Sequence, residues 1–252
     1  MMSKRLWSII LSLGITLAPA ATETLRLGIG TSPGSSYPPY QVLEKDGTYS
    51  GLSIDILHAI VRKTGDQIVA VYLPGPRLFA GITDGTIDID VFSNPRWRPQ
   101  YAADSLYTEP YLTTRMILVY RKDLADVPRS MRELAGRKLL TVNGFRYPGL
   151  DELFDRGEVV RDIAPSTALL LKMLQLNHGS LGVADEAVFL DLSRREQYDA
   201  LAPGFPVAPP SDVMMRFPKR LAAVVERFNR AIAELRQSGE LTRILAKYGL
   251  SP

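Results

Sequence analysis

The chain has 252 residues, with 30 lysines and arginines against 27 aspartates and glutamates, and it contains no cysteine. This length suits one large domain or two smaller domains that each bury a core. The lack of cysteine excludes a disulfide framework, and the interspersed charges lack the clustered basic surplus of a nucleic-acid-binding protein.

The first twenty residues have the three-part order of a secretory signal. Lys4 and Arg5 give a positive start, Leu6–Ala18 is apolar, and Ala18-Pro19-Ala20 places small residues where a signal peptidase reads them. The apolar stretch is too short to cross a bilayer, which needs about 20 apolar residues. We therefore expect residues 1–20 to be a signal peptide that is cleaved near Ala20, and the mature protein to be soluble and periplasmic.

Beyond this segment, short apolar runs alternate with patterns of helical spacing. Such alternation favours parallel-type sheets that are covered by helices on both faces. In the first part of the chain, the predicted elements are a strand at Leu25–Ile29, a helix at Ser53–Thr64 with Ser53 as its cap, a strand at Gln67–Leu73, a short helix at Leu78–Thr83 and a turn at Gly85–Asp88 into a further strand. In the middle they are a strand at Met116–Tyr120, a short helix at Met131–Ala135, a strand at Leu139–Val142, a helix capped by Ser166, a strand at Leu181–Ala184 and a helix at Glu186–Arg194. The last part has two helices, from Pro218 to Leu235 and from Leu241 to Tyr248.

Three stretches rich in proline or glycine are expected to be loops at strand ends, namely Pro33–Pro39, Pro74–Pro76 and Ala202–Pro210. In the helix that follows Ser166, the residues expected to face inward are Leu169, Leu170, Met173 and Leu174.

Few side chains could carry catalysis or bind a metal. His58 and His178 are the only histidines, and without cysteine or an HExxH motif a zinc site is not expected. Gly28-Ile29-Gly30 follows a strand, but the third glycine comes one residue late and Pro33 interrupts the helix that should follow. We therefore expect no dinucleotide site, no metal, no other cofactor and no catalytic residue.

A series of short motifs runs through the chain in a fixed order. The motifs are Leu25-Arg26-Leu27-Gly28, Tyr37-Pro38-Pro39-Tyr40, Asp46-Gly47, Gly51-Leu52-Ser53-Ile54-Asp55-Ile56, Gly85-Thr86-Ile87-Asp88, Tyr107-Thr108-Glu109-Pro110-Tyr111, Leu134-Ala135-Gly136-Arg137-Lys138-Leu139, Gly182-Val183-Ala184-Asp185-Glu186-Ala187-Val188, and Ser238-Gly239-Glu240-Leu241 with Tyr248-Gly249. In this order the chain resembles the bacterial extracellular solute-binding proteins of family 3, the polar amino-acid binders of ABC importers. The resemblance covers about Leu25 to Leu250.

The resemblance implies an α/β periplasmic binding protein fold of type II. In this fold, two lobes, each a mostly parallel sheet flanked by helices, enclose a ligand cleft. Residues 24–112 plus 213–252 would form lobe 1, and residues 113–212 would form lobe 2. The resemblance also implies a monomer that binds a small polar ligand, an amino acid or a related carboxylate, and delivers it to an inner-membrane ABC permease, with no nucleic acid as partner.

The two ends of an amino acid require two kinds of partner. A carboxylate favours the planar, permanently charged fork of arginine, and an ammonium group favours a carboxylate. If these partners lie on opposite lobes, ligand stabilises closure. By resemblance, Arg98 is the carboxylate clamp with Ser93 as its hydroxyl companion, and Arg96 is the alternative because the spacing to the neighbouring motifs differs from the family's. Asp185 would receive the ammonium group, cap the next helix, or do both.

Further candidates come from the loops. Asn94 adjoins Ser93, and Tyr37 matches a family aromatic that covers the ligand, whereas the neighbouring Tyr40 is equally suited to the core. The sequence Asn143-Gly144-Phe145-Arg146-Tyr147 replaces the family's Gly-Ser/Thr, so that bulk and the cation of Arg146 replace a hydroxyl donor.

Two other departures bear on the ligand. Pro74-Gly75-Pro76-Arg77 stands where the family often has an aromatic residue near position 78, and Arg77 could point into the cleft. Ser53 occupies a position that is usually acidic. With the bulk and cation of the second lobe, these departures favour a ligand with an extra negative charge, an aromatic group or no extra charge over an ordinary arginine or lysine binder.

Two other functions remain open for this fold. One is an enzyme that resembles the periplasmic cyclohexadienyl dehydratases, for which only carboxylates such as Asp185 or Glu109 could act as general acid or base. The other is a sensor module that reports ligand status to a membrane kinase or receptor.

Overall fold

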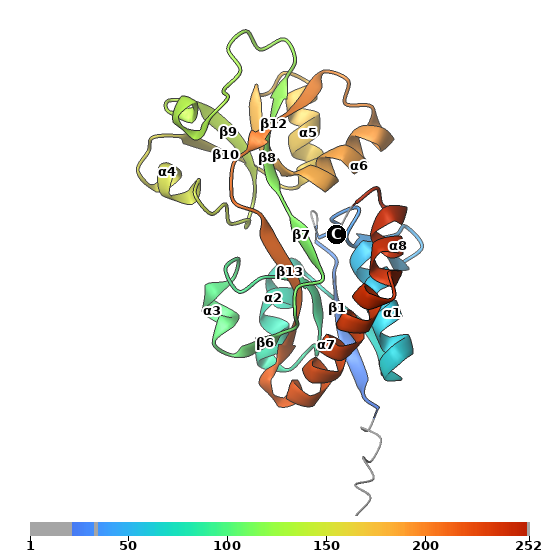
Figure 1. Cartoon of the computed structure of the whole chain (residues 1–252). Helices are drawn as coiled ribbons and strands as arrows, with labels where there is room; N and C mark the ends of the chain where they lie inside the picture. The colour runs from blue at the N-terminus through green and yellow to red at the C-terminus, as the bar shows by residue number, and fades with distance from the viewer. Residues whose placement is uncertain (1–21, 33–34, 251–252) are drawn as a thin grey trace, which may run out of the picture.

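The computed structural model describes residues 22–32 and 35–250, which form two lobes joined by two strands (Figure 1). The lower lobe in Figure 1 holds the first and the last described residues, and the upper lobe holds the middle of the chain. The predicted signal peptide at residues 1–20 lies outside the described residues. Among the helices that the structure describes, none has the length and apolar character needed to span a membrane.

Lobe 1 is built around β1 (Thr24–Gly30), whose Leu25, Leu27 and Ile29 are buried. β1 pairs in parallel with β4 (Gln67–Leu73), and Leu27 forms a parallel bridge to Ile89 at the start of the next sheet. That sheet contains β5 (Asp90–Ser93), β13 (Ser211–Pro218), β6 (Ser105–Tyr107) and, beside β13, β7 (Leu112–Thr114). The remaining elements of lobe 1 are β2 (Val42–Leu43), β3 (Tyr49–Ser50), α1 (Leu52–Thr64), α2 (Gly75–Asp84), α3 (Pro99–Ala102), a 3-10 turn at Lys219–Leu221, α7 (Ala222–Gln237) and α8 (Glu240–Lys247).

Lobe 2 contains one sheet of five strands in the order β10-β9-β11-β8-β12. These strands are β8 (Met116–Arg121), β9 (Lys138–Val142), β10 (Val160–Ala164), β11 (Leu181–Asp185) and β12 (Leu201–Pro206). A 3-10 turn at Met131–Leu134 and the helices α4 (Asp151–Asp155), α5 (Thr167–Gln175) and α6 (Glu186–Glu196) complete the lobe. All five residues of β11 are buried because strands flank it on both sides and helices cover it.

The two strands that connect the lobes lie side by side. β7 leads into lobe 2 and β13 returns from it, and the two pair in antiparallel register from Leu112 with Val213 to Thr114 with Ser211. The boundaries expected at residues 112/113 and 212/213 fall within these strands. The division of the chain into separate folding units stays a prediction.

The α/β two-lobed fold agrees with the prediction, but the sheets are not mostly parallel: the sheet of lobe 2 is mixed, and lobe 1 has one parallel pair beside an antiparallel sheet. β8, β12 and β13 run antiparallel to their neighbours, whereas β1 with β4 and β9 with β10 and β11 are parallel. The antiparallel strands arise where the chain enters lobe 2 and returns from it.

Serine caps only one of the two helices for which we predicted it. Ser166 accepts a hydrogen bond from the Leu169 amide and caps α5 as expected. α1 instead begins after Gly51, and the buried hydroxyl of Ser53 accepts a hydrogen bond from Tyr111 at 2.8 Å. Within α5, Leu169 is 40% exposed while Leu171 is buried, so the apolar face is rotated from the predicted one.

Two predicted loops contain regular structure. α2 already begins at Gly75, because Pro76 fits the first turn of a helix, where its missing N–H removes no hydrogen bond. Ala202–Pro210 includes most of β12, which is an edge strand of its sheet. An edge strand tolerates proline, and the pairing of β12 with β8 shifts between Pro203 and Pro206.

Candidate functional site

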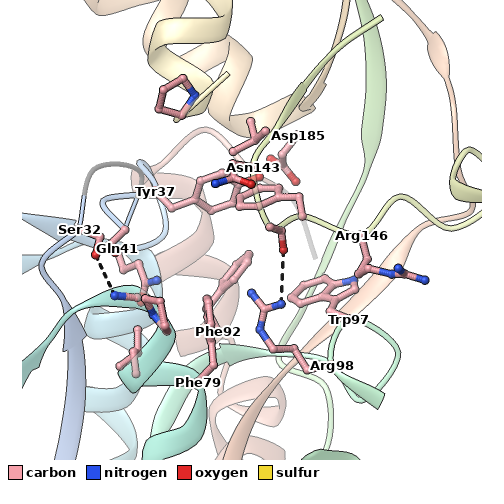
Figure 2. Close-up of a pocket in the computed structure, with 18 of the residues that line it drawn as sticks. Ser32, Tyr37, Gln41, Phe79, Phe92, Trp97, Arg98, Asn143, Arg146 and Asp185 are labelled. Atoms are coloured by element: carbon pink, nitrogen blue, oxygen red, sulfur yellow. Dashed lines mark hydrogen bonds between the residues drawn. The ribbon is translucent and has the colours of Figure 1, made fainter. Parts of the chain in front are cut away.

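A cavity of about 620 Å³ lies between the lobes (Figure 2). Lobe 1 contributes residues from the loop after β1, from α2, and from β5 with the segment that follows it. Lobe 2 contributes residues from the loop after β9 and from the end of β11. The cavity therefore sits beyond the carboxyl ends of strands, where ligands of open α/β sheets bind.

Asp185 joins the end of β11 to the start of α6 and faces this cavity. Its Oδ1 accepts hydrogen bonds from the amides of Ala187 and Val188 at 3.0 and 3.2 Å, which caps the helix. The same oxygen accepts a hydrogen bond from the Tyr40 hydroxyl of lobe 1 at 2.9 Å. The other oxygen, Oδ2, is buried and has no hydrogen-bond partner among the described residues.

The surroundings of Asp185 make its carboxylate energetically costly. The residue is 1% exposed, and this burial raises its pKa from 3.8 to about 6, although the helix amides and Tyr40 oppose the shift. A buried carboxylate with one free oxygen is suited to accept a hydrogen bond from a cationic donor.

Arg98 lies on the opposite side of the same cavity, in lobe 1 just before α3 (Figure 2). Its guanidinium carbon stands 3.5 Å from the centroid of the Phe79 ring, and its Nη1 donates to the Gly144 carbonyl of lobe 2 at 3.4 Å. Within the described chain, no carboxylate lies at salt-bridge distance from it. Burial is the main cause that lowers its pKa. Arg98 is thus a partly buried cation that faces the cavity, and the charge of Asp90 acts on it without a direct salt bridge.

Aromatic rings surround the space between these two charges. Phe92 and Trp97 stack with their centroids 5.5 Å apart. Tyr37 meets Phe92 edge to face at 5.6 Å and meets Phe145 of lobe 2 in the same way at 5.5 Å. Phe79 and Tyr101 also line the cavity. Aromatic rings therefore lie between Arg98 of lobe 1 and Asp185 of lobe 2 in the cavity wall.

Four of the seven predicted site residues line the cavity: Tyr37, Arg98, Arg146 and Asp185. Arg146 is at the rim, because 58% of its side chain is exposed and its Nε pairs with Asp151 at 3.2 Å. Arg98 rather than Arg96 faces the cavity, since the Arg96 side chain is exposed away from the described lining.

Arg77, Ser93 and Asn94 are not among the described lining residues, in contrast to the prediction. Because α2 begins at Gly75, Arg77 lies on its exposed face, while Leu78 and Phe79 line the cavity. Ser93 is buried in the sheet.

Asn94 holds the loop that carries Trp97 and Arg98. Its Nδ2 donates to the Asp212 carbonyl at 2.7 Å, and its Oδ1 accepts from the Arg96 amide at 2.8 Å. Asn94 is therefore positioned to support the cavity rather than to line it.

The sequence prediction missed several aromatic lining residues. Phe79 places an aromatic ring near the position where the family motif suggests one, but after the helix start instead of before it. Phe92 could have been found from the alternation of β5, whose Val91 and Ser93 are buried on the other face. Trp97 lies in a turn and carries no comparable signal. No group of His, Asp or Glu in the described part of the chain is arranged to hold a metal ion.

Curated relatives cover most of the chain at low identity. The L-cystine-binding protein TcyA of Bacillus subtilis (strain 168) is 20% identical over 234 residues, which is 88% of this chain and 80% of the relative. A probable amino-acid ABC transporter-binding protein of Haemophilus influenzae is 19% identical over 228 residues, which is 90% of this chain and 86% of the relative.

Solved structures share the fold. A histidine kinase sensor domain with similarity to periplasmic binding proteins superposes with a TM-score of 0.75 at 20% identity, covering 91% of this chain and 98% of its own. An ancestral arginine-binding protein bound to arginine gives 0.74 at 18% identity, covering 90% and 98%. The ancestral amino acid-binding protein AncCDT-1, a precursor of cyclohexadienyl dehydratase, gives 0.71 at 17% identity, covering 89% and 95%.

The family described as bacterial extracellular solute-binding proteins, family 3, matches residues 27–251, which include both lobes and every residue that lines the cavity. The chain belongs to this family.

Proposed function

We propose that this protein captures an amino acid, or a closely related small carboxylate, and presents it to an inner-membrane ABC permease. One observation carries the proposal: Arg98, which has no carboxylate at salt-bridge distance among the described residues, and Asp185, whose buried Oδ2 has no partner among them, line one cavity from opposite lobes. These two groups match the two charged ends of an amino acid.

In this mechanism the ligand carboxylate binds the fork of Arg98, and the ligand ammonium group donates to Oδ2 of Asp185. Each charge-assisted hydrogen bond contributes about 1.5–3 kcal/mol. With apolar burial between the poles, binding near −8 kcal/mol follows, which is a micromolar dissociation constant. Because each pole belongs to a different lobe, the ligand stabilises the closed arrangement over the open one.

The names of the relatives support a transport role. One is named an L-cystine-binding protein and the other a probable amino-acid ABC transporter-binding protein. The secretory pattern of residues 1–20 agrees with export to the compartment where such proteins meet their permeases.

Substitution at either pole should abolish binding. Asp185→Asn keeps the helix cap but removes the charge, and Arg98→Ala removes the fork, so each should weaken amino-acid binding about 100-fold or more. Isothermal titration of the full chain against a panel of amino acids measures this effect. Arg96→Ala is the matched control, because Arg96 is exposed two residues from Arg98, and it should bind as the native protein does. Normal binding by both pole variants would contradict the proposal.

Asp185 also favours a second candidate function, an enzyme on this fold of the cyclohexadienyl dehydratase type. A buried carboxyl group with a pKa of about 6 and a free oxygen is suited to donate and accept protons near neutral pH. Incubation with prephenate or arogenate tests this function. Formation of an aromatic product by the native chain, but not by Asp185→Asn, would support the enzyme over the transport protein.

A further inference from the structure

We infer that the cavity selects amino acids with an aromatic side chain. This inference rests on the proposed function, since it concerns the part of the ligand that lies between the two charged poles. Six aromatic residues from both lobes line the cavity: Tyr37, Phe79, Phe92, Trp97, Tyr101 and Phe145.

Four of these six rings form a continuous wall. Phe92, Trp97 and Tyr37 are linked by ring pairs at 5.5 and 5.6 Å, and Phe145 extends the chain of rings into lobe 2 at 5.5 Å from Tyr37. Stacked and edge-to-face pairs at these separations are favourable beyond simple area burial. A ligand ring that joins the wall gains such pairs with both lobes at once, which an aliphatic side chain cannot do.

The charges of the cavity disfavour ligands with a charged side chain. Among the described lining residues Asp185 is the only acid, so a ligand with two cationic groups would leave one of them without a carboxylate. The Phe79 ring is already stacked with the guanidinium of Arg98. Arg146, the lining cation besides Arg98, is largely exposed and paired with Asp151, so it offers little to an anionic side chain.

The cavity also has room for an aromatic ligand. Its volume of about 620 Å³ falls in the range of pockets that enclose small organic ligands. Polar lining groups, including those of Gln41 and Asn143, lie near the rings and could accommodate a ring hydroxyl or indole N–H.

Titration of the full chain with four amino acids tests the inference. L-phenylalanine should bind about tenfold or more tightly than L-leucine, and about 100-fold more tightly than L-arginine or L-glutamate. If L-leucine, L-arginine or L-glutamate binds as tightly as L-phenylalanine, the selectivity is wrong while the proposed function stands. If neither these four nor any other common amino acid or small carboxylate binds, the proposed function itself is wrong.

Variants of the ring wall provide a second, independent measurement. Phe92→Leu in lobe 1 and Phe145→Leu in lobe 2 should each weaken L-phenylalanine binding about tenfold and change L-leucine binding about threefold or less. Phe205→Leu is the matched control, because Phe205 is a partly buried residue of β12 outside the described lining. Because the two variants lie on different lobes, a folding defect in one leaves the other informative. An equal loss for both ligands would overturn the inference.

Trp97 supplies a direct signal of ligand placement. The chain has two tryptophans, and Trp7 lies in the predicted signal peptide, so the cleaved protein, or Trp7→Phe in the full chain, has Trp97 as its single indole, which lies in the wall of the cavity. Its fluorescence should change on addition of L-phenylalanine with the same dissociation constant that calorimetry gives. An unchanged emission at saturation would place the ligand elsewhere and overturn the inference.

Discussion

The two carboxylate oxygens of Asp185 have different roles, one structural and one proposed for ligand binding. Oδ1 accepts three hydrogen bonds, which hold the start of α6 and link Tyr40 of lobe 1 to lobe 2. Oδ2 is buried and has no partner among the described residues, and Asp185 is one of the residues that line the cavity. A buried charge that is only half satisfied lowers the stability of the folded protein, and such a cost is expected where a residue serves binding.

The stability of the ligand-free protein should therefore depend on pH through Asp185. Because the folded protein holds this proton with a pKa of about 6 against 3.8 for an ordinary aspartate, the unfolded chain binds fewer protons between these values. The contribution is fully present below about pH 4 and is lost as pH rises through about 6, with a size of order 3 kcal/mol. Urea unfolding at about pH 5 and about pH 8 measures the part that is lost between these two pH values, about 1.4 kcal/mol.

Asp185→Asn is the control for this pH dependence. Asparagine keeps the helix cap and the bond from Tyr40 but cannot ionise, so its unfolding free energy should lack this component. At neutral pH the variant should be more stable than the native protein even though it no longer binds ligand. A native-like slope in the variant would assign the pH dependence to other groups.

Single residues show what a motif can and cannot predict. Asp185 was placed at the cavity because it follows a buried strand, and strand ends meet there. The resemblance also placed Arg98 there. Arg77 was misplaced because one helix start, at Gly75 instead of Leu78, decides which side chains face inward. Ser93 is a similar case in a strand, because neighbouring residues of a strand face opposite sides of the sheet. A shift of one residue therefore decides whether Ser93 or Phe92 faces the cavity.

At the scale of elements, β13 is central to lobe 1. It pairs with β5 on one side and β6 on the other, and it continues into the connection between the lobes. Its Arg216 is fully buried and stands opposite Asp90 of β5, and Nη2 donates to the Phe79 carbonyl at 2.7 Å. Burial raises the pKa of Asp90, and the charge of Arg216 opposes that rise. The two opposite charges thus interact across the pair of strands, although Nε and Nη1 of Arg216 have no hydrogen-bond partner among the described residues.

Removal of either charge should leave the other uncompensated. Arg216→Met should lower the unfolding free energy by roughly 3 kcal/mol, as for other broken pairs of buried charges. The double variant Asp90→Asn with Arg216→Met should lose less than the sum of the two single variants, and a double-mutant cycle in urea measures this difference. Strictly additive losses would show that the two residues act separately.

Strongly patterned elements were predictable and weakly patterned ones were not. α7 and α8 carry a single apolar stripe each and were found close to their observed bounds. β10 escaped prediction because Arg161 and Asp162 interrupt its apolar residues, which an edge strand tolerates. In β13 the buried Arg216 has a partner that only tertiary structure provides, so no local pattern signals a central strand there.

At the scale of the whole molecule, contacts between the lobes flank the cavity. Tyr40 donates to Asp185, Arg98 donates to Gly144, and Tyr37 meets Phe145. The residues that make these contacts are those proposed to bind the ligand, or residues that lie next to them. Ligand binding and lobe closure should therefore be coupled through the same side chains.

Loss of one contact should shift the balance between the lobes. Tyr40→Phe removes one hydrogen bond between them, worth about 1 kcal/mol, and should shift the equilibrium about fivefold towards separated lobes. Small-angle scattering should then give a larger radius of gyration for Tyr40→Phe than for the native chain. Tyr49→Phe, in the hairpin of lobe 1, serves as the control and should leave the radius unchanged. Equal radii for Tyr40→Phe and the native chain would show that this bond does not hold the lobes together.

The middle of the chain enters and leaves the second lobe at one place, since Thr114 and Ser211 are partners across β7 and β13. Replacement of the whole intervening segment therefore needs only two neighbouring junctions. Such an exchange would transfer Phe145 and Asp185 as one unit and leave Arg98 with its parent. We expect gene recombination at these two junctions to yield hybrid binding proteins. The cavity of each hybrid would have the lobe 1 residues of one parent protein and the lobe 2 residues of the other.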